Sequence, residues 1–177
     1  MTEIPRWFDR HFEFTFPAEQ YPNLCVRLRG TPARLEEMMR GCALDILMRK
    51  TQEQTKEKWS AQEHAGHLLD LEPLWMRRVE DFLAGGSELT AADLSNRKTD
   101  QANHNSRPVE EILAEFRTAR LELANRLANI DLASVSRTML HARLKKPMRL
   151  VDHLYFAAEH DDHHLAWIWA LLHGSAR

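Results

Sequence analysis

Apolar residues recur with the 3.6-residue period of an amphipathic helix in four stretches of the chain. The first begins at Thr31–Pro32, where Thr31 suits an N-cap, and the second begins at Ser60 and ends before Gly85. The third follows Pro108 and the fourth follows Pro147. Four helices joined by polar connections predict an all-α protein with the architecture of a four-helix bundle.

The segments between these helices are predicted to be irregular. Residues 1–30 form an aromatic, proline-punctuated N-terminal arm that we expect to pack on the bundle. Residues 49–58, 87–107 and 131–146 are polar, and their patterns predict connections without a strand pair. A connection as long as 87–107 is usually functional or mobile. We expect one domain over residues 1–177.

Composition excludes several classes of function. The net charge is −2 and the charges are interspersed, which argues against nucleic-acid or membrane-surface binding. The longest apolar run, Leu165–Leu172, is too short for a membrane span. Cys25 and Cys42 form no recognised motif and are expected to be buried, reduced thiols, and no signal peptide is evident. These features predict a cytoplasmic protein.

Three histidines fall on faces that the helical pattern turns inward. His160 and His164 are four residues apart, so they lie on one side of the fourth helix, and His67 lies near the core side of the second. Three neutral imidazoles with one open position are typical of catalytic zinc, although nickel, iron and copper also bind imidazole. The alternative is that each is a core histidine. Asp161 and Asp162 either belong to a solvated face, or one of them or Glu159 accepts a hydrogen bond from a ligand histidine and orients it.

The remaining aromatic and histidine residues are assigned more simply. His64 and His163 are the rival candidates for ligands: His64 is expected at the cavity rim or near the helix cap, and His163 is rotated by about 100° from the ligand face. His104, in the long connection, could fold over the mouth of the site. Surface or loop positions are expected for His11, His141 and His153. The tryptophans are expected in the core or at an interface, with Trp167 shaping the floor of the pocket.

Two motifs resemble those of the DinB-like (YfiT-like) metalloprotein superfamily. Residues 59–68, followed by Asp70 and Glu72, resemble its second-helix motif, and residues 159–165 resemble its last-helix H-x-x-x-H motif. Residues 28–36 also look like its first-helix entry. The resemblance implies an up-down-down-up bundle, often a homodimer. It also implies zinc or nickel held by the three histidines His67, His160 and His164.

The same resemblance implies a metal-dependent enzyme acting on a small molecule. Characterised relatives include transferases and isomerases that use low-molecular-weight thiols, and others are assigned as hydrolases. No catalytic side chain can be named, because the sequence offers no other nucleophile motif; a metal-bound water or thiol is expected to react. The alternatives are a non-catalytic metal or small-molecule binding module, such as a stress-response sensor, and a bundle whose histidines are incidental.

Overall fold

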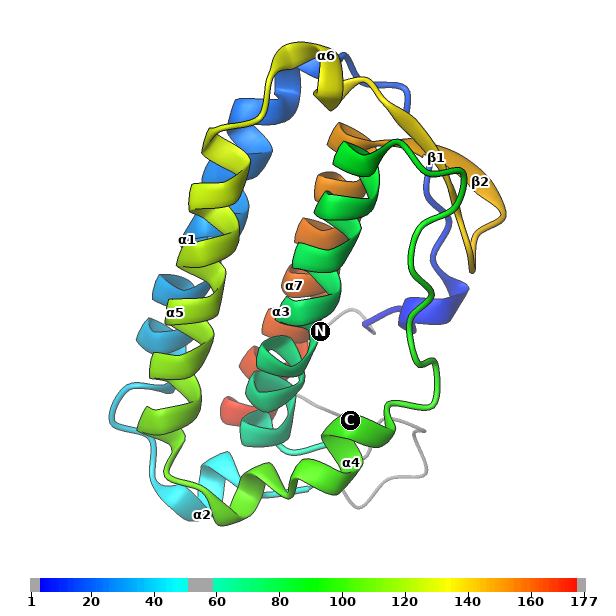
Figure 1. Ribbon diagram of the computed structural model, residues 1–177. Helices are drawn as coiled ribbons and strands as arrows, with labels where there is room; N and C mark the ends of the chain where they lie inside the picture. The colour runs from blue at the N-terminus through cyan, green and yellow to red at the C-terminus, as the bar shows by residue number, and fades with distance from the viewer. Residues whose placement is uncertain (1–3, 51–58, 175–177) are drawn as a thin grey trace.

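A computed structural model describes residues 4–50 and 59–174 and has four long helices (Figure 1). They are α1 (Tyr21–Met39), α3 (Ala61–Ala84), α5 (Val109–Ala128) and α7 (Leu150–Leu172). Shorter elements connect them: η1 (Trp7–Asp9), η2 (Ala18–Gln20), α2 (Leu44–Leu47), α4 (Arg97–Ala102), η3 (His104–Ser106), α6 (Leu132–Val135), β1 (Thr138–His141) and β2 (Lys146–Arg149). Within the described ranges, no helix is long and apolar enough to cross a membrane.

The four long helices form a bundle with the up-down-down-up order (Figure 1). Helices α1 and α7 run in one direction, and α3 and α5 run in the other. Each helix packs on two neighbours: α1 and α3 both contact α5 and α7. The parallel pair α3 and α5 requires a long crossover, which residues 85–108 supply. The predicted fold class is therefore confirmed.

The predicted boundaries of α3 are also confirmed. Ser60 is the N-cap and completes a capping box: its Oγ accepts from the Glu63 amide at 3.2 Å, and its own amide donates to Glu63 Oε2 at 2.8 Å. At the other end, Gly85 takes the left-handed conformation, with φ of 74°. These local signals fix the helix that carries His67.

The predicted start of the first helix is wrong, because α1 begins at Tyr21 and runs through Pro32. The N-terminal arm accordingly ends near residue 20 rather than 30. Pro32 lacks the amide hydrogen that would bond to the carbonyl of Leu28. Arg120 supplies the missing donor, since its Nη1 lies 3.0 Å from the Leu28 carbonyl oxygen. Thr31 does not cap the helix; its hydroxyl donates to Asp161 Oδ2 at 2.7 Å.

The prediction that residues 131–146 lack a strand pair is also wrong. Strands β1 and β2 form an antiparallel hairpin in which Leu140 pairs with Pro147. Lys145 lies in the turn between the strands and has a left-handed backbone conformation, with φ of 52°. Leu140 also exchanges backbone hydrogen bonds with the crossover, accepting from Leu89 and donating to Ser87, both at 2.9 Å. Proline is tolerated at position 147 because its partner Leu140 directs both its amide and its carbonyl to the crossover, so this pair needs no hydrogen bond from the proline nitrogen.

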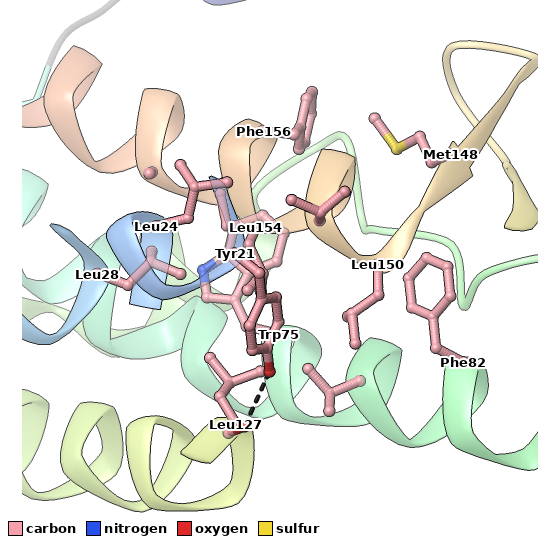
Figure 2. Packing of buried hydrophobic residues seen from close by; sticks show 14 of the residues in the cluster. Tyr21, Leu24, Leu28, Trp75, Phe82, Leu127, Met148, Leu150, Leu154 and Phe156 are labelled. Carbon is pink, nitrogen blue, oxygen red and sulfur yellow. Dashed lines mark hydrogen bonds between the residues drawn. The ribbon is translucent and has the colours of Figure 1, made fainter. Parts of the chain in front are cut away.

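The hydrophobic core is divided into two clusters with a polar layer between them. One cluster lies towards the hairpin and includes Trp75 and Leu154, and in it Tyr21 Oη donates to the Leu127 carbonyl at 2.8 Å (Figure 2). The other lies towards the opposite end and includes Leu68 and Leu165. Along α7, residues 159–164 lie between the apolar positions of the two clusters. This division places the histidine motif at mid-bundle.

Candidate metal centre

The three predicted histidines come together between α3 and α7. One nitrogen from each of His67, His160 and His164 lies within 4.8 Å of the others. Their exposed fractions are 4%, 6% and 5%, so all three rings are buried. No other group of three or more potential ligands gathers in the described part of the chain. The helical spacing therefore brings together the residues that the sequence singled out.

The nitrogen geometry fits a shared cation. His160 Nε2 and His164 Nε2 are 3.2 Å apart. Two nitrogens bound at 2.0–2.1 Å to one tetrahedral zinc ion would lie about 3.3–3.4 Å from each other, close to the observed separation. His67 Nδ1 is engaged elsewhere, so its Nε2 remains for the cluster. The donor set therefore suits a divalent metal.

Burial keeps these imidazoles neutral, the form that binds metal. Burial lowers the pKa of His67 to about 4, and neighbouring charge from Asp70 only partly opposes this effect. The pKa values of His160 and His164 are also far below the usual value because of burial, and the close imidazoles add to the shift. At neutral pH each of these rings therefore has one unprotonated nitrogen, whose lone pair can bind a metal.

A hydroxyl from the crossover orients His67. Thr99, in α4, has its Oγ1 3.0 Å from His67 Nδ1 and 2.9 Å from Asp70 Oδ2. The hydroxyl proton goes to the carboxylate, so Oγ1 accepts from Nδ1–H of His67. This fixes the tautomer with a free Nε2. Sequence reasoning missed Thr99, because it lies in a polar segment without periodicity.

His104, which the sequence suggested could fold over the mouth of the site, packs against the backbone of α3. Its Nε2 donates to Asp70 Oδ2 at 2.9 Å, and its side chain is 2% exposed. The ring lies directly on the α3 backbone at Gly66, where a β-carbon would be 2.2 Å from His104 Cγ. A glycine at this position is the sequence signal for such a close approach.

The expectation that His64 lies at the rim is wrong. It is 1% exposed, and its Nδ1 lies 2.8 Å from Nδ1 of His164. Burial lowers the pKa of His64 to about 3, so its ring is neutral. In the tautomer of His164 that has Nε2 free for a metal, His164 Nδ1–H donates to His64 Nδ1. This hydrogen bond leaves His164 Nε2 facing His160. His64 is thus a second orienting residue, located one turn before His67 on the same buried face.

Several other histidine predictions are corrected by burial. His141 and His153 are 2% and 1% exposed rather than on the surface, because the hairpin and the start of α7 bury them. His11 is exposed, as predicted. His163 is rotated out of the cluster, and its ring lies 5.7 Å from that of Trp7.

The acidic residues of the last helix do not orient the histidines. Asp161 is paired with Arg120, and Asp162 with Arg27 and Arg34. Glu159 is paired with Arg10 and Arg27. Arg120 also holds Glu72, with Nη2 2.6 Å from Oε1, and all three members of this network are at most 3% exposed. The carboxylates of α7 thus fasten this helix to α1 and α5, and Arg120 links α3 to the network through Glu72.

Two tryptophans lie against rings of the cluster. Trp59 lies with its ring centroid 4.6 Å from that of His67, and its Nε1 donates to Asp100 at 3.1 Å. Trp7, from the N-terminal arm, lies edge-on to His160 at 4.8 Å. Trp167, predicted at the pocket floor, stacks on His64 at 6.3 Å instead of contacting the cluster directly. Trp169 is 49% exposed and lies outside the core.

Comparison with known proteins agrees with this architecture. The sequence profile of the DinB superfamily matches residues 27–168. Among solved structures, YfiT from Bacillus subtilis aligns with a TM-score of 0.78 over 93% of this chain and 93% of its own, at 17% identity. That protein is described as a probable metal-dependent hydrolase with an unusual four-helix bundle topology. No curated protein gave a significant sequence match.

Proposed function

The chain belongs to the DinB superfamily, and from this premise we propose that it is a metal-dependent enzyme acting on a small molecule. The observation that carries the proposal is the buried, neutral set of His67, His160 and His164. Three imidazole donors with no fourth ligand in the described cluster are typical of a catalytic site. Closed, four-ligand sites are typical of structural zinc.

Under this proposal the protein holds zinc or nickel through the Nε2 atoms of the three histidines. A bound divalent cation supplies Lewis acidity and lowers the pKa of a water or thiol that it binds. His64 and Thr99 keep His164 and His67 in the metal-binding tautomers. Trp7 and Trp59 restrict water around the rings, which strengthens electrostatic interactions inside.

Two reaction classes fit this arrangement. The description of YfiT as a probable metal-dependent hydrolase supports hydrolysis. The resemblance to thiol-dependent members supports S-transfer from a low-molecular-weight thiol. We further propose a single domain over residues 1–177 that acts as a homodimer in the cytoplasm.

A non-catalytic binding module is the second candidate, and one specific observation favours it. Each carboxylate near the cluster is committed to another partner: Asp161 to Arg120, Asp70 to His104 and Thr99, and Glu63 to the capping box. The described site therefore lacks a free general base. A metal or small-molecule sensor needs none.

Elemental analysis tests the site. Protein purified without an affinity tag should contain about one zinc or nickel per chain. A His160→Ala/His164→Ala double variant should lose the metal while keeping its helical circular-dichroism spectrum. A His11→Ala variant, altered at an exposed position, should retain it. Equal metal content in all three proteins would overturn the proposed site.

A substrate screen separates the two candidates. Metal-loaded protein should turn over activated esters or amides, or else pairs of a small thiol and an electrophile, and the double variant should not. Turnover in neither set, together with stoichiometric metal, would favour the binding module.

A further inference from the structure

Arg143, in the turn of the hairpin, is a cation without an anionic partner among the described residues. Its Nη2 is buried and has no hydrogen-bond partner. Its guanidinium carbon lies 5.9, 5.2 and 5.6 Å from the ring centroids of Trp7, Phe8 and Phe156. Other arginines of the chain form ion pairs: Arg10, Arg27, Arg34, Arg107, Arg117, Arg120, Arg126 and Arg149.

One aromatic ring separates Arg143 from the histidine cluster. Trp7 contacts both, with its ring 4.8 Å from that of His160 and 5.9 Å from the Arg143 guanidinium carbon. Phe156 also contacts Arg143 and precedes His160 by one turn of α7. The charge of Arg143 also adds to the effect of burial in lowering the pKa of His160, so the guanidinium and the histidine cluster are neighbours in space.

The surroundings of Arg143 favour an incoming anion. Burial lowers the pKa of Arg143 below its ordinary value, whereas carboxylate partners raise the pKa of Arg120 above it. Arg78, nearby, also lacks an ion pair among the described residues: its Nε donates to the Thr90 carbonyl at 2.8 Å, and its Nη1 lies 3.3 Å from His141 Nε2. A partly buried guanidinium with an unused N–H gains strongly from a carboxylate.

We propose that Arg143 binds a carboxylate of the substrate that reacts at the three-histidine site. This inference rests on the proposed function and names its substrate class: small molecules with a carboxylate a few bonds from the reacting group. The planar guanidinium donates to the two carboxylate oxygens, and the aromatic rings of Trp7 and Phe156 line the apolar part.

Ligand titration tests the subsite without turnover. Adipate and its neutral analogue adipamide are titrated into metal-free and zinc-loaded protein at pH 7.5, with tryptophan fluorescence as the readout because Trp7 lies against Arg143. Adipate should bind wild-type protein about tenfold more tightly than adipamide. Inorganic phosphate, an anion without an apolar chain to lie along Trp7 and Phe156, should bind more weakly than adipate.

Variants assign the effect to the guanidinium. Arg143→Met should bring the two affinities within about twofold of each other, and Arg143→Lys should retain part of the preference because it keeps the charge but not the planar fork. Lys145→Gln removes a charge from the same turn, two residues away and at an exposed position, and should retain the full preference. An adipate preference that is absent from wild type or unchanged in Arg143→Met would overturn the proposal.

An assay with two substrates distinguishes failure of the Arg143 subsite from failure of the proposed function. The zinc-loaded enzyme is assayed with mono-4-nitrophenyl adipate and with its methyl ester, which lacks the charge. Loss of the preference for the acid in Arg143→Met, with the methyl-ester rate unchanged, supports both proposals. Hydrolysis of both esters without any role for Arg143 overturns the subsite alone. Arg143-dependent adipate binding without hydrolysis supports the subsite and counts against the hydrolase.

Discussion

His67 and Thr99 are joined by a hydrogen bond of 3.0 Å between Nδ1 and Oγ1, although they lie 32 residues apart in the chain. The same hydroxyl reaches Asp70 Oδ2 at 2.9 Å, so its proton is directed away from the imidazole. The bond therefore couples the crossover to the candidate metal centre. It holds the ring of His67 in one orientation and in one tautomer.

Removing this hydroxyl should weaken metal binding. In Thr99→Val, which keeps the side-chain shape, the zinc affinity should fall by about 10–100-fold, as for other outer partners of metal-bound histidines. Competition with a chelating dye measures this affinity. Thr99→Ser keeps the hydroxyl and should stay near the wild-type value. Equal loss in both variants would assign the effect to packing rather than to the hydrogen bond.

Removing the cation of the buried ion network should reduce the free energy of unfolding far more than removing the cation of a surface ion pair on the same helix. Arg120→Met leaves Glu72 and Asp161 buried without their cation, so the free energy of unfolding should fall by about 3–5 kcal/mol. Arg117, one turn earlier in α5, pairs with Glu36 at the surface. Arg117→Met should cost less than about 1 kcal/mol. Urea unfolding of both variants provides the comparison, and similar losses would contradict the prediction.

Local sequence signals were sufficient to predict the helical bundle and to bring the three central histidines together. The period of 3.6 residues placed His160 and His164 on one face, and the capping box of Ser60 fixed the register that turns His67 inward. These features depend on residues near one another in the chain. Short-range patterns of this kind are therefore visible in a single sequence.

Tertiary contacts explain what the sequence did not reveal. Pro32 looked like a helix start because proline is favoured in the first turn of a helix. It is tolerated inside α1 because Arg120, a residue from another helix, supplies the missing hydrogen bond. Thr99 could not be found from a periodic pattern, because its role depends on a single hydroxyl that contacts His67 and not on the face of a helix. The hairpin was missed because a proline usually argues against a strand. Pro147 nevertheless lies in β2, one of the two strands of a small sheet in which each strand has an unpaired edge.

Two glycines in helices should respond oppositely to the same change. In Gly66→Ala the new methyl group would overlap the His104 ring, at 2.2 Å from Cγ, so the ring and its bond to Asp70 must move. This should reduce the free energy of unfolding by about 1–3 kcal/mol. At Gly30, within α1, a β-carbon would have no atom of the described residues within 4 Å beyond its own stretch of helix, and Gly30→Ala should stabilise by about 0.5–1 kcal/mol. Thermal unfolding of both variants tests the contrast.

Mild acid should destabilise the metal-free protein through its buried histidines. Burial lowers the pKa of His64 to about 3, of His67 to about 4 and of His141 to about 3, each below the ordinary value of 6.5. The unfolded chain therefore binds more protons than the folded chain between these values, and stability falls as the pH falls below about 6.5. Each such histidine contributes up to about 1.4 kcal/mol per pH unit within that window.

His141 lies outside the metal cluster, so a variant at this position tests the effect of one buried histidine alone. Between pH 7.5 and 5 its protonation in the unfolded state should cost at most about 2 kcal/mol of stability, a loss that His141→Asn should remove. The asparagine oxygen can still accept from the Leu144 amide, as His141 Nδ1 does at 3.1 Å. Urea midpoints across this range measure the difference, and from pH 7.5 to 9 the two proteins should have parallel profiles. Parallel profiles below pH 6.5 as well would mean that His141 is protonated equally in the folded and unfolded chains, which its burial beside Arg78 argues against.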